Sequence, residues 1–412
     1  MERVVITGMG LISPLGNSVE QFWDRLVSGE SGISPITSFD TSNFKAKIAG
    51  VVHDFDAEAR FGRKEARRMD RFSQFALAAT EEAWKQSGLQ LDKIDKERLG
   101  VYVGSGVGGI QTLMEQGSVL DRRGPDRVSP TLIPMMISNM AAAMISIRLG
   151  AMGPTMAPVT ACSIGNTAIG EAFRLIHYGG ADIVIAGGSE AAITEISLAS
   201  FGNATSLSTR NEEPSKASRP FDGGRDGFVI GEGGGIVILE SLTHALRRNA
   251  EIHGEVIGYG ASSDAYHMVA THPEGIGAYQ AMKLALNEAN LQPKDVNVIS
   301  AHATSTVVGD RSETLAIKKL FGDQAHRIPI TANKSMTGHA LGAAGGLEAI
   351  ALIKSIQEGI IPPTINQEIK DSICDLDYVP NIARKTDLTI GMSNSFGFGG
   401  HNAVIVIRKF ED

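Results

Sequence analysis

The sequence predicts an α/β protein in which two similar halves form one compact body. Short apolar runs with the composition of buried strands alternate with amphipathic helical patterns along the chain. Two pairs of segments also repeat within the chain, which indicates an ancient duplication. We place the first half at 1–250 and the second at 251–412, because a helical pattern ends near residue 250 and no low-complexity linker follows it.

The expected elements follow one another in a regular order from the N-terminus. The chain opens with an early charge pair and a β-branched run. We expect the first buried strand there, since a signal peptide would need an apolar core. A helical pattern over 21–29 comes next. Further strand-like runs, separated by helical patterns, cover 100–106, 181–191, 233–240, 254–260, 296–302, 327–333 and 403–409.

Two long insertions interrupt this alternation. Residues 106–150 are rich in methionine and proline, and their second part has a helical pattern. Residues 201–230 are polar and rich in turn-forming residues. Insertions of this length are typical of functional loops or interfaces.

The internal repeat concerns the two segments that carry the most chemistry. Aligning Cys162 with His339, at an offset of 177 residues, matches an apolar strand, a turn of small residues and an amphipathic helix in both segments. A second match pairs 79–90 with 281–292, each a helix followed by a turn and a strand. If a pseudo-twofold axis relates the halves, Cys162 and His339 meet in one central site.

Composition excludes several classes of protein. The chain has 412 residues, 42% of them hydrophobic and 20% charged, which suffices for a substantial core. Its net charge of −8 argues against nucleic acid as a partner. No apolar run reaches the roughly 18 residues of a membrane span, so we expect no membrane partner. With only Cys162 and Cys374 there is no disulfide framework, which favours the reducing cytoplasm.

Cys162 is the candidate nucleophile. It lies in APVTACSIGNTAIG, in a turn of small residues between an apolar strand and a helix. The amides and the dipole at the N-terminus of that helix favour a thiolate, so we expect a lowered thiol pKa and covalent thioester chemistry. The alternative is a small buried hydrophobe, as free cysteine often is. The strand–cysteine–helix setting and the repeat favour the nucleophile.

Two histidines are the candidate partners of this thiol. His302 ends a strand in ISAHATSTVVGD, and His339 follows Lys334 in NKSMTGHALG. Two neutral imidazoles can each donate Nε2–H to one carbonyl oxygen and stabilise an enolate there, with Lys334 keeping the potential positive. Metal binding is the main rival. We expect no metal, because neither histidine has a carboxylate or thiol at the usual ligand spacing.

The glycine-rich segment 391–406 is not a dinucleotide-binding motif, because it precedes a strand and does not open a helix. We interpret it as a mobile aromatic loop beside the active site. Phe396 or Phe398 would cover an acyl pocket, and a backbone amide there would serve as an oxyanion donor. The alternative is a tight turn with two core phenylalanines.

Together these segments resemble the β-ketoacyl-acyl carrier protein synthases, the condensing enzymes of fatty-acid synthesis, and most closely the synthase II type. The resemblance covers essentially the whole chain. It implies a thiolase-like five-layer αβαβα fold made of two pseudo-duplicated halves, a cytoplasmic homodimer, and acyl carrier protein as the partner that delivers both substrates. Its motifs are VVITGMGLISPLG, RKEARRMDRF, ASRPFD, RDGFVIGEG, DAYHM, KSMTGH and NSFGFGGHN.

The resemblance also implies a role for individual residues. Cys162 matches the acylated nucleophile, and His302 and His339 match the pair that directs malonyl decarboxylation. Phe398 matches a gating phenylalanine whose amide joins that of Cys162 in the oxyanion hole. The remaining matches are Lys334 and Glu348 as polar support for the histidines, Thr304 and Thr306 as phosphopantetheine contacts, Val107 as an acyl-pocket residue, and Lys64, Arg67 and Arg68 as carrier-contacting cations. We add Phe396 to the substrate-binding residues, and Arg63 to the carrier-docking surface because it belongs to the same basic stretch.

The implied mechanism is ping-pong. An acyl chain passes from its carrier to Cys162, malonyl-carrier protein then loses carbon dioxide, and the resulting enolate attacks the thioester. The product is a 3-oxoacyl chain two carbons longer. This chemistry requires no metal or organic cofactor, because the carrier brings its own phosphopantetheine.

Some residues depart from the family pattern, and other functions stay open. Ala303 replaces the usual glycine after the first histidine, Thr205 replaces an arginine that helps to hold the carrier, and Val107 replaces an isoleucine of the acyl pocket. One alternative is a ketosynthase of a polyketide or specialised-lipid pathway. Another is a non-catalytic chain-length partner subunit, which should lack the nucleophile. A thiolase is the third, but it pairs cysteine with histidine differently.

Overall fold

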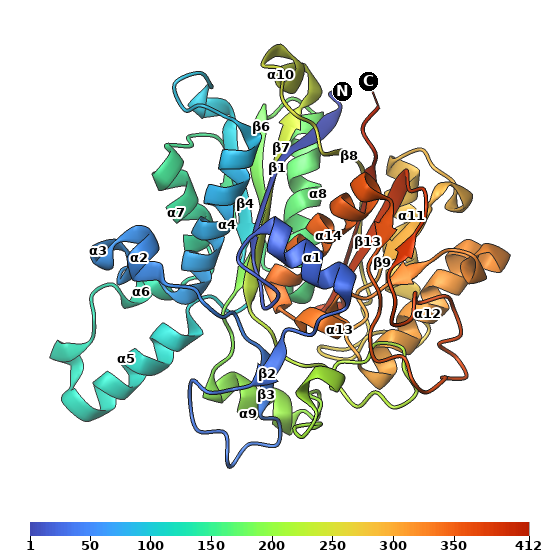
Figure 1. Ribbon diagram of the computed structural model, residues 1–412. Coiled ribbons are helices and arrows are strands. Elements are labelled where there is room, and N and C mark those ends of the chain that lie inside the picture. The colour runs from blue at the N-terminus through green and yellow to red at the C-terminus, as the bar shows by residue number, and fades with distance from the viewer. Residues whose placement is uncertain (412) are drawn as a thin grey trace.

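A continuous sheet of ten strands runs through the computed structural model, which describes residues 1–411 (Figure 1). The strand order is β10-β9-β13-β14-β8-β1-β7-β6-β4-β5. Its strands are β1 Val4–Ile12, β4 Leu99–Gly104, β5 Thr155–Met156, β6 Ile183–Glu190, β7 Gly233–Ser241, β8 Gly254–Ser263, β9 Val298–Ser300, β10 Ile330–Thr331, β13 Ile390–Gly397 and β14 His401–Arg408. Two small hairpins pair β2 Ile33–Pro35 with β3 Ile48–Gly50, and β11 Ile360–Ile361 with β12 Arg384–Lys385.

The large sheet divides into two halves of five strands each. β1 pairs with β8 only over Val4–Ile6, and the register of β1 on β7 shifts just after Ile6. Outward from this junction the orders are β1-β7-β6-β4-β5 and β8-β14-β13-β9-β10. In both halves the first two pairings are antiparallel and the last two are parallel. The predicted duplication is confirmed.

Helices complete five layers around these strands. α4 and α7 cover one outer face, α8 and α14 lie between the two halves of the sheet, and α11 and α12 cover the other outer face (Figure 1). This arrangement confirms the thiolase-like αβαβα fold. The helices are α1 Val19–Ser28, α2 Ala57–Phe61, α3 Arg63–Ala66, α4 Arg71–Ser87, α5 Ile110–Arg123, α6 Leu132–Met136, α7 Met140–Leu149, α8 Ile164–His177, α9 Glu195–Asn203, α10 Leu242–Arg247, α11 Ile276–Glu288, α12 Val307–Phe321, α13 Lys334–Thr337 and α14 Ala344–Glu358.

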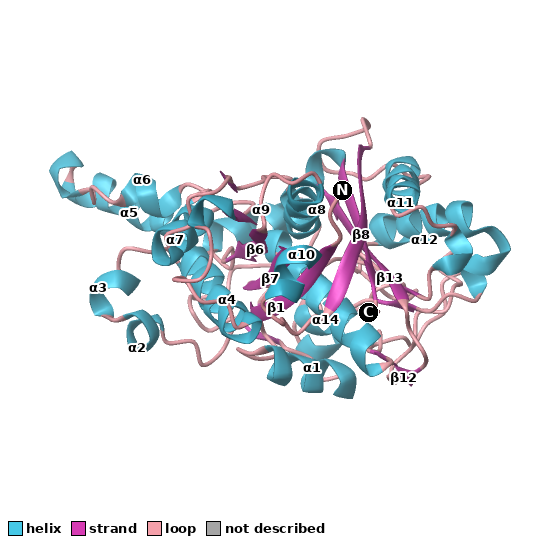
Figure 2. Ribbon diagram, turned by 90° about the horizontal axis from the view of Figure 1, so that it is seen from above, coloured by secondary structure: helices cyan, strands magenta, loops and turns pink. Residues whose placement is uncertain are grey.

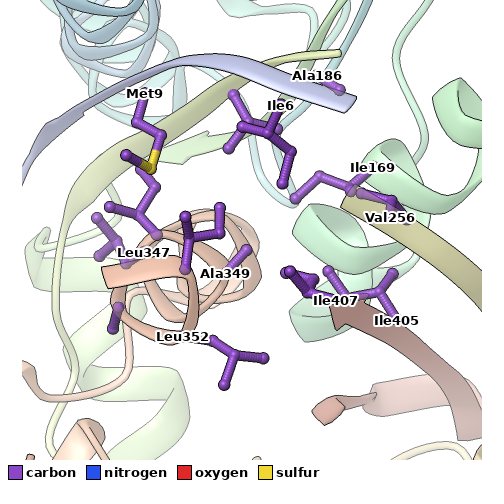
Figure 3. Close-up of a cluster of buried hydrophobic side chains, with 14 of the residues drawn as sticks. Ile6, Met9, Ile169, Ala186, Val256, Leu347, Ala349, Leu352, Ile405 and Ile407 are labelled. Carbon is purple, nitrogen blue, oxygen red and sulfur yellow. The ribbon is translucent and has the colours of Figure 1, made fainter. Parts of the chain in front are cut away.

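The central layer carries the largest apolar cluster. Side chains of α8 and α14 pack against strands of both halves (Figure 3). Leu347 and Leu352 of α14 lie with Ile6 of β1 and Ile405 of β14, and all four are nearly inaccessible to water. Burying each large aliphatic side chain contributes about 1.5–3 kcal/mol. This cluster therefore holds the two halves together next to the N-termini of α8 and α14, where Cys162 and His339 lie.

The second sequence repeat has the same packing in both halves. Gly10 lies in β1 so close to α4 that an added Cβ would sit 2.1 Å from the carbonyl oxygen of Ala79. Gly260 in β8 approaches α11 in the same way, and its Cβ would lie 2.0 Å from the carbonyl oxygen of Ala281. Ala79 and Ala281 are the paired first residues of the two repeat segments, so the predicted match of 79–90 with 281–292 is confirmed.

The register predicted for the first repeat is wrong by three residues. Short 3₁₀ helices over Ala161–Ser163 and Leu341–Ala343 lead into α8 and α14. Each begins with a left-handed residue, at φ 51° in the first and 46° in the second. Gly342, not His339, is therefore the structural equivalent of Cys162. A shift of three residues is nearly one helical turn, so it leaves the apolar stripe of the helix almost unchanged and the sequence match looks equally good.

The two insertions take different forms. The first folds into α5, α6 and α7, and Figure 2 shows α5 and α6 reaching out from the side of the molecule. The second is mostly irregular between α9 and β7. In residues 1–411 no helix is both long and apolar enough to cross a membrane. The boundary at residue 250 stays a prediction, because the sheet is continuous across the halves.

Candidate active site

A cavity of about 520 Å³ lies at the junction of the two halves and collects eight of the predicted site residues. Its walls come from the loops after β4, β8, β9 and β13, from α9 and the polar insertion that follows it, and from the starts of α8 and α14. The predicted residues in this lining are Val107, Cys162, His302, Thr304, Thr306, His339, Phe396 and Phe398. Segments far apart in the sequence are thus brought to one place.

The turn before α8 presents Cys162 to this cavity. Ala161 has φ 51°, a left-handed conformation that costs energy for a residue with a side chain. Gly397, at the end of β13, packs directly against the turn, and a Cβ there would lie 3.0 Å from the amide nitrogen of Cys162. The cysteine side chain is buried but lines the cavity. Backbone strain and close packing therefore fix the sulfur in place.

The predicted lowering of the thiol pKa is wrong for this site. Burial raises the pKa of Cys162 to about 12, although the charge of Lys334 and the backbone N–H groups of Phe398 and Cys162 oppose this rise. Removing the sulfur from water costs a thiolate more than these three favourable groups return. These two backbone N–H groups are the pair that the family resemblance implies for the oxyanion hole, and both act on the sulfur of Cys162.

The raised pKa predicts the pH dependence of alkylation by iodoacetamide. The thiolate is the reactive form, and below its pKa its fraction rises about tenfold for each pH unit. We expect the alkylation rate of Cys162 in a Cys374→Ser variant to climb in this way from pH 7 to pH 10, as followed by intact-protein mass spectrometry. A rate that levels off near pH 7 or 8 would show that the helix N-terminus outweighs burial.

The two histidines lie next to each other at the cavity, and both are neutral imidazoles. Their ring centroids are 5.4 Å apart and the rings are nearly perpendicular. Burial, followed by the positive charge of Lys334, lowers the pKa of both His302 and His339 well below the usual value. Nδ1 of each ring is buried without a partner among residues 1–411, so Nε2 is the nitrogen open to the cavity. The pair can donate two hydrogen bonds to one oxygen atom.

A buried carboxylate fixes the loop of His302. Glu313 on α12 accepts hydrogen bonds from the backbone N–H groups of His302 at 2.9 Å and Ala303 at 2.8 Å. It also accepts one from the side chain of Asn394 at 3.0 Å. Sequence reasoning missed Glu313, because partners that are backbone amides leave no signal in side-chain identity.

The polar insertion positions the second histidine. The N–H of His339 donates to the carbonyl of Val229 at 2.7 Å, and the N–H of Gly231 donates back to the carbonyl of His339 at 2.9 Å. Its ring packs at 5.5 Å against the ring of Phe228. Phe228 was also missed as a site residue, although it stands in the RDGFVIGEG motif. The insertion is therefore part of the site, as its length suggested.

Lys334 and Glu348 lie behind the histidines and do not line the cavity. They form an ion pair in which both side chains are almost fully buried. Burial raises the pKa of Glu348 to about 7 against the effect of Lys334. The ammonium helps to lower the pKa of His302 and His339 through its electric field, and its supporting role in the reaction stays a prediction.

Two threonines after β9 and two phenylalanines at the end of β13 also line the cavity. The hydroxyls of Thr304 and Thr306 lie 3.0 Å apart, and Thr306 also caps the N-terminus of α12. Phe398 is 37% exposed beside the ring of Phe201, which suits a side chain that can move. Phe396 is almost buried, with its ring 5.6 Å from that of His302.

Two departures from the family pattern lie in different surroundings. The methyl group of Ala303 is packed in the core of the second half and does not line the cavity, although the residue directly follows His302. Its φ of 39° explains why glycine is usual there. Thr205 lines the cavity, also with a left-handed backbone at φ 52°.

The basic stretch lies outside the cavity lining. Arg63 and Lys64 belong to the short helix α3, and Arg67 and Arg68 follow it. All four are exposed, and Arg67 forms an ion pair with Glu58 at 3.2 Å. Across residues 1–411, no group of three or more His, Cys, Asp and Glu side chains is placed to hold a metal ion.

Comparison with protein families identifies this architecture. The description "Beta-ketoacyl synthase, N-terminal domain" matches residues 1–245, and "Beta-ketoacyl synthase, C-terminal domain" matches residues 253–368. The chain belongs to the β-ketoacyl synthase family. Curated relatives named 3-oxoacyl-[acyl-carrier-protein] synthase 2 from Synechocystis sp. and Staphylococcus aureus are each 49% identical over 410 residues, which covers 100% of this chain and 99% of theirs.

Solved structures of β-ketoacyl synthases share the whole fold. A β-ketoacyl synthase from Burkholderia phymatum is 35% identical with a TM-score of 0.93, and the match covers 100% of both chains. A type II polyketide ketosynthase complex, AntDE:AntF, which includes an acyl-carrier protein, is 36% identical with a TM-score of 0.92 and covers 99% of this chain and 100% of that one.

Proposed function

We propose that the protein catalyses the decarboxylative condensation of an acyl chain with malonyl-acyl carrier protein in fatty-acid elongation. The observation that carries this proposal is the meeting of one thiol, two neutral imidazoles and two backbone N–H groups in one cavity. The test is purified protein with hexanoyl- and malonyl-acyl carrier protein. We expect 3-oxooctanoyl-acyl carrier protein and one carbon dioxide per product, and no condensed product would refute the proposal.

In the first half-reaction the sulfur of Cys162 attacks the acyl thioester. The carbonyl oxygen becomes an oxyanion, which the N–H groups of Cys162 and Phe398 stabilise. The bond to the carrier's sulfur then breaks, and the proton of the cysteine ends on that sulfur. A raised resting pKa does not prevent this step, since the exchange leaves no net charge.

In the second half-reaction the malonyl thioester loses carbon dioxide. The electron pair of the broken carbon–carbon bond forms an enolate, whose oxygen receives two hydrogen bonds from Nε2 of His302 and His339. The enolate carbon attacks the thioester carbonyl, the bond to Cys162 breaks, and one proton restores the thiol. Neutral rings can serve in this step, because each still carries one N–H group that Nε2 can present to the enolate oxygen.

Fatty-acid elongation is favoured over the polyketide alternative by sequence identity. The 3-oxoacyl-[acyl-carrier-protein] synthases are 49% identical to this chain, whereas the polyketide ketosynthase complex is 36% identical. Cys162 argues against a non-catalytic chain-length subunit. We also propose that the boundary between the two halves lies between residues 250 and 251, that the reaction needs no metal or organic cofactor, and that the enzyme works in the cytoplasm, as two unpaired cysteines favour.

We further propose a homodimer that forms through the free edge at β5. Both residues of this edge strand are exposed, and β4 pairs with only one side of it. The large apolar side chains of Ile147, Met152, Met156 and Val159 are exposed in the same region. An exposed edge strand with apolar neighbours is unfavourable for a monomer, and a second copy would cover both.

The proposed carrier-docking surface is the basic stretch at α3. Acyl carrier proteins are acidic and this chain has a net charge of −8, so local positive charge is needed for encounter. We expect Arg67→Glu with Arg68→Glu to raise KM for carrier-bound substrate and to weaken its dependence on salt. Turnover of a small acyl-pantetheine thioester should stay nearly unchanged in the same kinetic assay.

A matched variant controls for net charge. Lys93 and Lys96 are exposed residues away from α3, and reversing both to glutamate changes the total charge by the same amount. That variant should retain the KM of the unaltered enzyme. Equal losses with carrier-bound and pantetheine substrates in the Arg67/Arg68 variant would show that the stretch is structural.

A further inference from the structure

Glu190 is a fully buried carboxylate at the cavity that the half-reactions above do not use. It is the last residue of β6, and its side chain is inaccessible to water. Its four hydrogen-bond partners are neutral: one hydroxyl and three backbone N–H groups. Glu240 of the neighbouring strand β7 is equally buried but has the cation of Arg248 beside it. Burying a carboxylate without a neighbouring cation lowers the stability of the folded protein. We therefore expect Glu190 to serve a function at the cavity.

Each oxygen of Glu190 accepts two hydrogen bonds. Oε1 accepts from the hydroxyl of Ser105 at 2.7 Å and from the N–H of Val107 at 3.2 Å. Oε2 accepts from the N–H of Gly106 at 2.8 Å and from the N–H of Gly342 at 3.1 Å. The first three donors belong to the turn after β4, and the fourth belongs to the segment that opens α14. One carboxylate therefore ties together two cavity walls that come from different halves.

The two cavity walls approach each other so closely that only glycine fits at positions 106 and 342. A Cβ added at Gly342 would lie 2.9 Å from Oε2 of Glu190 and 3.1 Å from the nitrogen of Gly106. A Cβ added at Gly106 would lie 2.8 Å from the same Oε2. Val107 follows Gly106 in this turn, lines the cavity and is 41% exposed. Its backbone is held by the hydrogen bond from its N–H group to Glu190.

We propose that Glu190 is a positioning residue that sets the acyl-chain length the enzyme prefers, because it fixes the Ser105–Val107 turn against the start of α14. The proposal rests on the proposed condensation. Glu190 acts on the cavity wall through Val107. Its negative charge also contributes to the raised pKa of Cys162, an effect that does not depend on the length of the acyl chain. The four hydrogen bonds of Glu190 hold the turn against the start of α14 and so fix the depth of the cavity. Acyl chains that need a different depth must displace this wall and therefore react less readily.

The carboxylate is required because all four partners donate. A glutamine at 190 has only one accepting oxygen. Its NH₂ group would face the other two donors, and of the four partners only the rotatable hydroxyl of Ser105 could accept a hydrogen bond from it. The amide keeps the volume of the side chain and removes its negative charge. It cannot accept hydrogen bonds from the donors of both walls. Glu190→Gln should therefore release the turn without creating a void.

The experiment compares acyl-enzyme formation from hexanoyl- and dodecanoyl-acyl carrier protein in the unaltered enzyme and in Glu190→Gln. We expect the ratio of kcat/KM for the two chains to change by about tenfold, the size of effect that one misfitting methylene in an apolar pocket produces. Carbon dioxide release from malonyl-carrier protein should change far less. A purely structural role would lower both chain lengths alike and leave their ratio unchanged, and that result would overturn the proposal.

Two further variants keep the test decisive. Glu240→Gln alters an equally buried carboxylate at the opposite end of the β6–β7 pair, and it should leave the chain-length ratio unchanged. Ser105→Ala removes one of the four donors and decides the matter if Glu190→Gln fails to fold: a smaller change in the ratio supports the proposal, and no change overturns it. If the unaltered enzyme forms no acyl-enzyme with either chain, the proposed function itself has failed.

Discussion

Cys162→Ala abolishes both acyl transfer and elongation, and this is the largest effect that the site predicts. No other thiol lines the cavity in the part of the chain that the structure describes. Removing the nucleophile of a covalent mechanism leaves only binding and oxyanion stabilisation, so we expect activity to fall by a factor on the order of 10⁶. Single-turnover transfer from radiolabelled acyl-carrier protein measures the loss.

The second cysteine provides the matched control. Cys374 is buried in the core of the second half, and burial raises the pKa of its thiol to about 11. Cys374→Ala should therefore retain acyl transfer. Acylation of Cys374 in the Cys162→Ala protein would refute the assignment of the nucleophile.

We expect His302→Ala and His339→Ala to have the next largest effect, and to slow the malonyl half-reaction more than acyl transfer. Each substitution removes one of two donors to the developing enolate, which should cost about 3–4 kcal/mol, or a factor of about 10² to 10³ in rate. Release of carbon dioxide from radiolabelled malonyl-carrier protein measures this step. Acyl transfer to Cys162 should survive better, because the oxyanion donors there are backbone amides.

A third histidine separates chemistry from folding. His253 is buried like the pair but bonds to Gln357 away from the cavity. His253→Ala should lose stability in thermal unfolding yet release carbon dioxide at the unaltered rate. If His302→Ala instead slowed both half-reactions equally, the division of labour between thiol and imidazoles would be wrong.

Local sequence patterns predicted most of the long strands and helices and the duplication, because strand and helix periodicities depend on neighbouring residues. They missed β13, which lies in the glycine-rich segment whose pattern indicated a loop. They did not settle the register of the first repeat. A slip of three residues keeps the apolar stripe of α14, and only the left-handed backbone of Ala161 and Leu341 resolves it. The site residues were identifiable because their motifs are specific, and eight of them line one cavity.

Features that depend on burial or on backbone partners were beyond the sequence. The raised pKa of Cys162 follows from the removal of water by residues distant in the chain. Glu190 and Glu313 bind backbone N–H groups, which every residue except proline carries, so no pattern of side chains reveals them. The place of Ala303 in the core, away from the cavity, likewise depends on the tertiary fold.

The most direct test of the proposed mechanism is mass spectrometry of the protein before and after each substrate. With hexanoyl-acyl carrier protein alone, the intact mass should rise by one hexanoyl group, and the modified peptide should contain Cys162. Adding malonyl-acyl carrier protein should restore the original mass as 3-oxooctanoyl-acyl carrier protein appears. A stable acyl group on any other residue, or an acyl-enzyme that malonyl-carrier protein does not discharge, would contradict the mechanism.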